Sequence, residues 1–425
     1  MRLQARHVVP AIVETLGLLA AAMAGTAPAR RIQPDELAYR GAFRLPEGSG
    51  GTDWGWSGDG LAYCPEGDPA GGDDGFPGSL FGIGHDHKQF VSEISIPAPV
   101  VSKAKKPEEL PTARTLQPFA DVRAGHFKDY EIYRSGLAWL PPQGRQTTPK
   151  LYFCFGDHMH EGYDGPTHGW CEADLKNPQT AGMWPVGKLQ SYVTNDYMFP
   201  IPKAWADANL PGMLLATGRF REGGQGGRGP SLVAIAPWLD GNPPAPGTRL
   251  KAVPLILYTS VEAGDELILR GYEHPDEWEG GAWLTARDAA AVVFVGTKAI
   301  GKCWYGFSNG VVWPDEAPFP PIPDPPHNDR GWWATRFEGQ MVFYDSADLA
   351  AVARGQKKPH EPQPYAVLRL DEWLFTIKGP QQKHHVRSCA FDPGRGHLYV
   401  MEPRADADDK PIIHVWSLEP LARRP

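Results

Sequence analysis

The sequence predicts an all-β fold, a single β-propeller of five four-stranded blades. Three features of the chain support this prediction. Its 48 glycines and 44 prolines make up about a fifth of the 425 residues, against roughly 12% on average, which indicates many turns and few long helices. Its 15 tryptophans, 14 tyrosines and 17 phenylalanines provide a large core and exclude a disordered chain. The third feature is an internal repeat.

The repeat is a triplet of short apolar segments that occurs five times. Each segment is rich in β-branched and aromatic residues and is bounded by Gly, Pro or Asp, so each triplet reads as three antiparallel strands. The third copy is degenerate. The triplets occupy residues 60–65, 79–87 and 90–97; 136–141, 150–158 and 168–175; 203–208, 212–219 and 231–238; 280–286, 291–298 and 340–349; and 388–393, 397–403 and 412–418.

A fourth apolar segment between triplets completes a blade, because four strands per repeat are typical of a propeller. Examples lie at residues 116–122, 253–260 and 365–373. The last triplet ends at Leu418 and leaves no room for a fourth strand, whereas residues 38–46 precede the first triplet and have the same character. We therefore expect the N-terminal strand to close the last blade, which removes two exposed sheet edges. The weak third copy leaves six or seven blades as the alternative.

The first 29 residues have the order of a secretory signal peptide. A basic beginning with Arg2 and Arg6 is followed by an apolar region over residues 8–24 and by small residues at 24–29. The alternative is an amphipathic N-terminal helix. We expect residues 30–425 to form the propeller domain, secreted or periplasmic, with no membrane span after cleavage.

Charge and cysteine content narrow the class of protein further. The chain has 42 Lys+Arg against 50 Asp+Glu, a net charge of −8, which argues against a nucleic-acid-binding protein. Its five cysteines include no CxxC pair, which argues against a structural zinc site. Cys154 and Cys171 lie on consecutive predicted strands, where they either form a disulfide or remain small buried thiols.

With its five triplets and its N-terminal closing strand, the chain resembles secreted bacterial β-propeller proteins of the five-bladed type. The resemblance covers nearly all of the mature chain and is generic. Five-bladed propellers include glycoside hydrolases and sugar-binding lectins, but the sequence has none of their diagnostic motifs. Any evidence for function therefore lies in the site residues.

Long loops on one face of the predicted propeller carry most of the ionisable and aromatic residues. They follow the second strand of each blade or precede its first strand, and long loops on one side of a rigid scaffold usually carry function. Polar groups where the second strands end are His85, Asp157 and His158, Arg219, Lys298, and Glu402. A second ring, three residues before an aligned alanine of each inner strand, contains Asp59, Ser135, Glu279 and Arg387. This mixture suits an anionic or polyhydroxylated ligand in an axial pocket.

Glu279 is the first candidate for a catalytic acid. It lies between Trp278 and Trp283 where an inner strand begins, and desolvation there is expected to raise its pKa. Asp59 and Asp157 are candidate partners for the hydrolysis of a glycosidic bond. The alternative for Glu279 is a structural carboxylate in a turn.

Residues 301–339 interrupt the fourth blade on the same face and are expected to form a lid or a wall. The segment contains Trp304 and the sequence RGWW at 330–333. Because aromatic rings over a polar pocket stack on sugar rings, the expected substrate-binding residues are Trp278, Trp304, Arg219, Arg387, His385, Lys298 and Glu402. The alternative is a loop that packs its own tryptophans.

Two other chemistries use the same loops. In a lyase, Arg219 or Arg387 neutralises a uronic carboxylate while His85 or His158 removes the proton from the neighbouring carbon. In a metal-dependent oxidoreductase, the loop histidines and carboxylates hold Zn, Fe or Cu, although their spacing matches no specific metal motif.

The sequence thus favours an extracytoplasmic carbohydrate-active propeller, a hydrolase or lyase with an axial polar pocket. The alternatives are a non-catalytic propeller that binds a glycan or a protein, and the metal-dependent oxidoreductase. The expected partner is a carbohydrate or another oxygen-rich ligand and not nucleic acid. The leading function requires no cofactor, and a divalent metal is left open.

Overall fold

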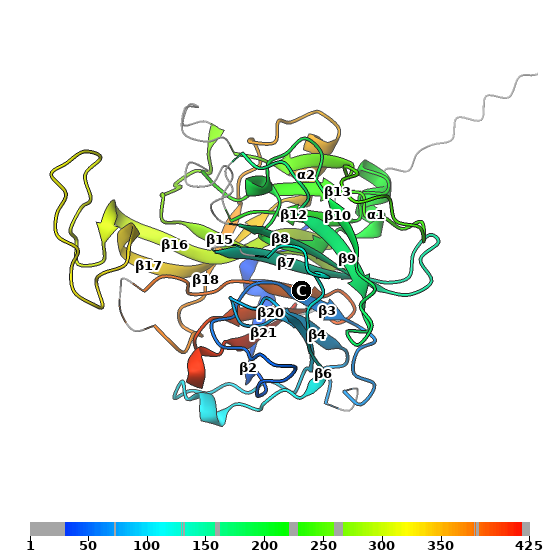
Figure 1. Ribbon diagram of the computed structural model, residues 1–425, viewed down its shortest axis with the longest axis horizontal. Coiled ribbons are helices and arrows are strands. Elements are labelled where there is room, and N and C mark those ends of the chain that lie inside the picture. The colour runs from blue at the N-terminus through cyan, green and yellow to red at the C-terminus, as the bar shows by residue number, and fades with distance from the viewer. Residues whose placement is uncertain are drawn as a thin grey trace, which may run out of the picture.

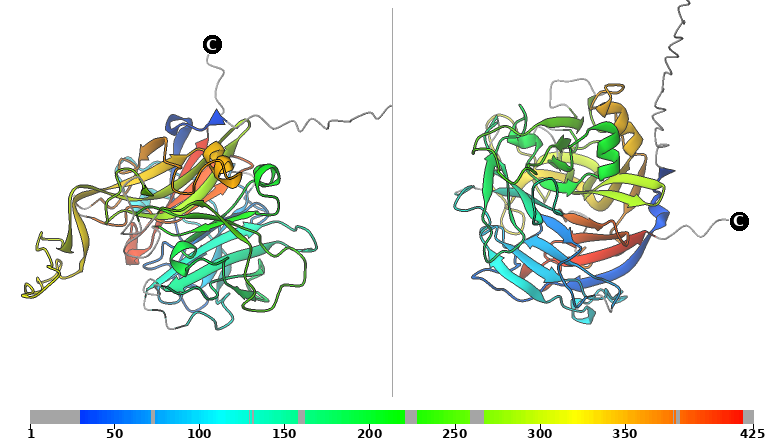
Figure 2. Two further views of the ribbon diagram at one scale, coloured as in Figure 1. Left: turned by 90° about the horizontal axis from the view of Figure 1, so that it is seen from above. Right: turned by 90° about the vertical axis from the view of Figure 1, so that its right-hand side faces the viewer.

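The structure, a computed structural model, describes residues 30–71, 74–128, 130, 132–157, 162–220, 228–258, 267–377, 379 and 382–418. These residues form five sheets (Figure 1), and the right-hand view of Figure 2 shows them arranged as blades in a ring. The innermost strands contact one another in chain order around the axis. The prediction of a five-bladed β-propeller is therefore confirmed. The predicted signal peptide, residues 1–29, lies outside the described residues.

The blades follow one another along the chain. From the innermost strand of each blade outward, the strands are β3 (Leu61–Cys64), β4 (Ser79–Ile83), β5 (Val91–Ser95) and β6 (Thr115–Ala120); β7 (Tyr133–Leu140), β8 (Lys150–Asp157), β9 (His168–Glu172) and β10 (Ala181–Trp184); β11 (Tyr197–Pro200), β12 (Leu215–Gly218), β13 (Leu232–Ile235) and β14 (Ala252–Ile256); β15 (Glu277–Ala286), β16 (Ala289–Phe307), β17 (Arg330–Tyr344) and β18 (Ala366–Arg369); and β19 (Cys389–Asp392), β20 (His397–Glu402), β21 (Ile412–Leu418) and β2 (Leu37–Arg44). A short strand β1 (Arg30–Arg31) pairs in parallel with the beginning of β16.

The central strands are buried on both faces because each blade packs between two neighbours. All residues of β4 and β8 are buried, for example, and strands of this kind read as nearly continuous apolar segments rather than as alternating ones. The five largest clusters of buried apolar side chains each join one pair of adjacent blades. The core is therefore a ring of interfaces around the axis.

The N-terminal strand closes the last blade, as predicted. β2 pairs antiparallel with β21, from Leu37 opposite Leu418 to Arg44 opposite Ile412. The first and last parts of the chain thereby share one sheet, and the outer edge of β21 is covered.

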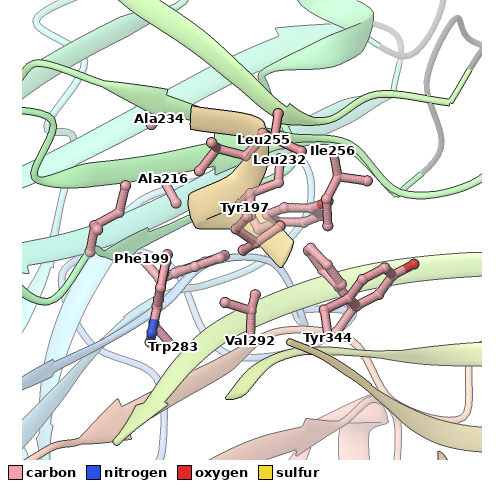
Figure 3. Close-up of a cluster of buried hydrophobic side chains, with 14 of the residues drawn as sticks. Tyr197, Phe199, Ala216, Leu232, Ala234, Leu255, Ile256, Trp283, Val292 and Tyr344 are labelled. Atoms are coloured by element: carbon pink, nitrogen blue, oxygen red, sulfur yellow. The ribbon is translucent and has the colours of Figure 1, made fainter. Parts of the chain in front are cut away.

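The third blade differs from the predicted strand assignment. Residues 203–208, predicted as its inner strand, belong to helix α1 (Lys203–Asn209), and the inner strand is β11. The segment is rich in alanine and follows Pro202, so it favours the beginning of a helix. Tyr197 and Phe199 of β11 instead bring their rings into the core between the third and fourth blades (Figure 3).

The helices are short. Besides α1 there is α2 (Ser346–Ala353), which begins where the sequence predicted the end of a strand, because the Asp345 carboxylate accepts a hydrogen bond from the Ala347 N–H at 2.8 Å. Among the described residues, the 3-10 helices are η1 (Pro34–Glu36), η2 (Pro107–Glu109), η3 (Ser191–Val193) and η6 (Ala407–Asp409). In the described part of the chain, every helix is too short or too polar to cross a membrane.

The segment 301–339 forms a long β-hairpin. Its two ends continue β16 and β17 beyond the blade, with Trp304 opposite Trp333 and Tyr305 opposite Trp332, and residues 308–329 connect them. The hairpin projects from the ring in Figures 1 and 2. The predicted insertion is therefore largely an extension of two strands of the fourth blade.

Cys154 and Cys171 are both free, buried thiols. They lie on the adjacent strands β8 and β9, but Cys154 is opposite His168 and Cys171 is opposite Leu151. An offset of three residues separates them by roughly 10 Å along the strands, which is beyond the reach of a disulfide. Cys154 and Cys171 are therefore small buried thiols and do not form a disulfide, which is the second of the two alternatives.

Candidate functional site

An open cavity of about 420 Å³ lies at one end of the propeller axis. We call it the axial pocket. Its lining residues lie at or just before the beginning of the inner strands β3, β7, β15 and β19, in the loops that follow β4 and β20, and on the β16–β17 hairpin. These are the two sets of loops that the sequence predicts on one face.

The centre of the site is a buried network of ion pairs around Glu279. Its Oε1 atom accepts hydrogen bonds from Arg134 Nη1 at 2.7 Å and from Arg387 Nη2 at 2.9 Å. Arg387 Nη2 also lies 2.8 Å from Asp59 Oδ1, and Arg134 Nε lies 3.9 Å from Asp196 Oδ1. The Glu279 side chain is only 2% exposed. Carboxylates and guanidiniums from different blades are thus bound to one another beneath the axial pocket.

The backbone of β15 is shaped to allow this network. The pairing of β15 with β16 shifts register between Glu277 and Gly280, which marks a β-bulge. A Cβ atom at Gly280 would lie 2.4 Å from the Arg387 carbonyl oxygen. Glycine at this position therefore lets the chain that carries Arg387 approach the strand that carries Glu279.

Glu279 is a carboxylate and not a proton donor at neutral pH. Burial alone would raise its pKa, but Arg387, His384 and Arg134 outweigh burial and hold the pKa well below its usual range. The predicted rise in its pKa is therefore wrong. The two tryptophans beside Glu279 are evident in the sequence, whereas the two guanidiniums come to it from the second and fifth blades.

A second pair, His384 and Glu277, lies at the surface of the axial pocket. His384 Nδ1 is 3.1 Å from Glu277 Oε2 and 3.6 Å from Glu279 Oε2. Burial would lower the pKa of His384, but the two carboxylates raise it to about 9. Burial would raise the pKa of Glu277, but His384 brings it down to about 2. At neutral pH the pocket therefore presents a protonated imidazole held by a carboxylate.

The sequence predicts that His385, the neighbour of His384, binds the ligand. The His385 side chain is 1% exposed, and its ring nitrogens lie 2.8 Å from Asp371 Oδ1 and 2.9 Å from the Gln382 carbonyl oxygen. Both ring nitrogens are therefore engaged within the protein. Both histidines are evident in the sequence, but nothing in it shows which of the two neighbours faces the pocket.

Glu277, Glu279 and His384 could also ligate a metal ion, since one donor atom of each lies within 4.8 Å of the others. Glu279 Oε1 is already bound by Arg134 and Arg387. A divalent cation held by Glu277, His384 and Glu279 Oε2 would lie close to both guanidiniums, which are bound to the other oxygen of the same carboxylate. The arrangement therefore favours a proton on His384 over a metal ion.

The walls of the axial pocket combine aromatic rings with cations. The guanidinium of Arg404 lies 4.0 Å from the ring centre of Trp56. Trp332 stacks on His274 with ring centres 4.5 Å apart and meets Tyr305 edge-on. Among the described lining residues, the cations Arg134, Arg330, Lys383, His384, Arg387 and Arg404 outnumber the carboxylates Asp59, Asp86 and Glu277. The pocket is thus suited to an anionic ligand with a ring.

Three residues of this pocket have a left-handed backbone conformation. The φ angles of Trp56, His384 and Arg404 are 58°, 55° and 54°. A residue other than glycine pays roughly 1–2 kcal/mol for this conformation, and for a bulky side chain it is rare. Strain of this kind gathers at functional sites, so these three side chains are held where they are at a cost to stability.

Some predicted site residues lie behind or beside the axial pocket. Arg219 is fully buried, donates to Asn195 Oδ1 at 3.1 Å and covers the ring of Tyr192. Asp157 is buried at the end of β8. His85 lies 2.9 Å from Asp86 and lines a neighbouring cavity. His158 lies outside the described residues.

Four other predicted substrate-binding residues have contacts within the protein. Glu402 accepts hydrogen bonds from the backbone of Phe375 and Thr376 and lies 2.8 Å from His414. Lys298 pairs with Asp276 at 3.0 Å. Trp278 is 1% exposed and belongs to the core, while the Trp304 indole donates to the Phe307 carbonyl within the hairpin. We therefore do not include these four in the site.

No protein-family model matches the chain, and no curated protein matches it. Among solved structures, the chain is similar to the β-propeller domain of Cps50 (Swd1) from Myceliophteria thermophila, with 11% sequence identity over 88% of this chain and 100% of that chain and a TM-score of 0.26. A likeness this distant says nothing about function.

Proposed function

We propose that the axial pocket takes an acidic sugar of a polysaccharide and that the protein cleaves the chain by elimination. The observation that carries this proposal is the His384–Glu277 pair, which holds a proton donor at the surface of a cation-rich pocket. The protein would act outside the cytoplasm, where residues 1–29 are expected to direct it.

Charge and shape support an acidic sugar over a neutral one. A sugar carboxylate that meets Arg330, Lys383 or Arg404 would gain a charge-assisted hydrogen bond worth roughly 1.5–3 kcal/mol. The rings of Trp56 and Trp332 offer apolar surfaces for the C–H faces of a sugar ring. A neutral sugar would use the rings but leave the cations without a ligand.

Elimination requires a cation near the carboxylate, a base and an acid. The base removes the proton on the carbon next to the carboxylate, the C–O bond on the following carbon breaks as a C=C bond forms, and the departing oxygen takes a proton. Asp59 lines the pocket, and burial raises its pKa, which makes it a stronger proton acceptor. His384 is the proton donor, and Glu277 keeps it protonated.

Hydrolysis has less support because the candidate acid for it does not carry a proton. Glu279 is ionised and its Oε1 atom is bound by Arg134 and Arg387. Its role is to position these two guanidiniums, so the pocket retains its charge pattern when a ligand enters.

The first experiment is a screen of the purified protein against polygalacturonate, alginate and glucuronan, with starch and cellulose as neutral controls. Elimination gives products with ultraviolet absorbance from the new C=C bond, whereas hydrolysis gives new reducing ends without this absorbance.

Asp59→Asn is expected to lower the rate of the absorbance increase at least about 100-fold, because it removes the base that takes the proton. Asp240→Asn, at an exposed carboxylate that pairs with Arg145, is the matched control and should retain the wild-type rate.

Each outcome of the screen separates the candidate functions. Reducing ends without absorbance would make the protein a hydrolase, and binding without turnover would favour the non-catalytic propeller. No binding of any acidic polysaccharide by the folded protein would contradict the proposal.

Trp56 provides a test that separates binding from stability. We expect Trp56→Gly to lower the free energy of unfolding by no more than about 2 kcal/mol, because glycine adopts a φ of 58° without strain and this relief offsets part of the lost packing. The residue is 43% exposed, so its removal loses the burial of the remaining surface and the contact with the Arg404 guanidinium. The affinity for the acidic sugar should fall at the same time, as measured by calorimetric titration. A destabilised variant with unchanged affinity would show that Trp56 is a structural residue.

A further inference from the structure

A second cavity of about 670 Å³ adjoins the axial pocket. The two cavities share four lining residues, Lys383, His384, Pro403 and Arg404. We call the second cavity the hairpin pocket, because Ser308, Trp333 and Thr335 of the β16–β17 hairpin line it. Each cavity lies in the size range of roughly 300–1,000 Å³ that is typical of ligand pockets, so the pair offers room for more than one sugar ring.

The hairpin forms a wall between the two cavities. Trp332 and Trp333 are neighbours on β17, and successive side chains of a strand point to opposite faces. Trp332 lines the axial pocket and Trp333 lines the hairpin pocket. The Lys383 ammonium lies 3.8 Å from the ring centre of Trp333. Each cavity therefore has its own tryptophan, and Lys383 lies between them.

Charge indicates in which direction an acidic chain would continue from the axial pocket. The described residues that line the hairpin pocket include the titratable side chains His327, Lys383, His384 and Arg404. They include no carboxylate. A third cavity, which shares Trp56 with the axial pocket, is lined by the carboxylates Glu47, Asp53 and Asp408. In that cavity Lys410 already pairs with Glu47 at 2.9 Å. An anionic polymer would be repelled from the carboxylate-lined cavity and attracted to the hairpin pocket.

We propose that the hairpin pocket is a second subsite for the same acidic polysaccharide, so that consecutive sugars occupy the two cavities and the bond to be broken lies at their junction. The inference rests on the proposed function of the axial pocket. His384 lines both cavities and is therefore placed to give its proton to the oxygen that links the two sugars. The substrate is accordingly a chain with an acidic sugar on each side of the broken bond, and a monosaccharide fills only one subsite.

Two glycines allow each cavity to be blocked separately. Gly331 lines the axial pocket, and a Cβ atom there would meet only the Lys383 Nζ atom, at 3.4 Å. Gly379 lines the hairpin pocket, and among the described residues a Cβ atom there meets nothing within 4 Å. Gly331→Trp and Gly379→Trp are thus a matched pair that fills one cavity each with little disturbance of the backbone.

The test is calorimetric titration with galacturonate, glucuronate and mannuronate, each as monosaccharide and as tetrasaccharide, after circular dichroism has shown native folding. Every protein in the titration carries Asp59→Asn so that the tetrasaccharide is not cleaved, and the protein with both glycines intact is the reference. For at least one sugar, the tetrasaccharide should bind the reference protein at least about tenfold tighter than the monosaccharide. Gly379→Trp should remove that gain while the affinity for the monosaccharide stays within about twofold. Gly331→Trp should weaken both ligands at least about tenfold.

The possible failures are distinguishable. Equal affinity of the reference protein for monosaccharide and tetrasaccharide, or a tetrasaccharide affinity that Gly379→Trp leaves unchanged, would overturn the second subsite while the axial site stands. No binding of either length by the reference protein would contradict the proposed function and the second subsite together.

Discussion

Replacing Glu279 with glutamine is expected to lower the free energy of unfolding by about 2–4 kcal/mol. The change leaves Arg134 and Arg387, which approach Glu279 at 2.7 and 2.9 Å, without their shared counter-charge in a buried site. Removing one partner of a buried ion pair typically costs about 3–5 kcal/mol, and the amide oxygen of glutamine recovers part of this. Chemical denaturation of wild type and Glu279→Gln at neutral pH measures the difference.

The matched control is Glu277→Gln, whose side chain is 20% exposed and lies 3.1 Å from His384. We expect it to destabilise the protein by less than about 1 kcal/mol, as is usual for partly exposed pairs. A Glu279→Gln protein with wild-type stability and no turnover would contradict the positioning role and would restore Glu279 as a catalytic acid.

The largest expected effect on turnover is that of His384→Gln. If His384 protonates the departing oxygen, its loss should lower kcat by about 10²–10⁴-fold while the acidic sugar still binds. The wild-type rate should fall as the pH rises through about 9, because the pKa of His384 is about 9 and the donor loses its proton there. The residual rate of His384→Gln should lack this fall. A kcat/KM profile from pH 6 to 10 for both proteins measures the effect.

The same histidine affects stability with a definite sign. The pKa of His384 is raised in the folded state from 6.5 to about 9. The stabilisation from its pair with Glu277 is therefore fully present below pH 6.5 and is lost as the pH rises through about 9. The control is His385→Gln, which should lower stability because its buried ring loses its contacts with Asp371 and Gln382. Wild type and His384→Gln with the same pH dependence of thermal unfolding would contradict the assigned charge state.

Much of the site could be predicted from the alignment of the inner strands. The position three residues before the aligned alanines yields Asp59, Glu279 and Arg387, and these three form one network. In the second blade the same position is Ser135, which donates to Gln89 at 2.7 Å, while its neighbour Arg134 joins the network. Aligning the repeats predicts how far along the axis a residue lies. An alignment that is wrong by one residue selects a side chain on the other face of the strand, as it does with Ser135 in place of Arg134.

Other differences arose where tertiary contacts decide between local alternatives. Residues 203–208 match the strand pattern and have a composition that favours a helix, and the rings of Tyr197 and Phe199 occupy the core position that the predicted strand would have taken. The pKa of Glu279 depends on guanidiniums from other blades, which lie far away in the sequence. The strand count could be predicted because it depends on local pattern and turn residues, whereas charge states depend on which distant groups meet.

The pairing of β2 with β21 has a consequence for when the protein becomes functional. Residues at opposite ends of the chain must meet before the last blade exists, and contacts of such long range form late and slowly in folding. The ion pair between Arg387 and Asp59 joins the last blade to the first, so the charge network of the site is complete only when the ring has closed. A chain still in synthesis would have most of its blades but no complete site. Ligand binding can therefore serve as a direct measure of how far folding has proceeded.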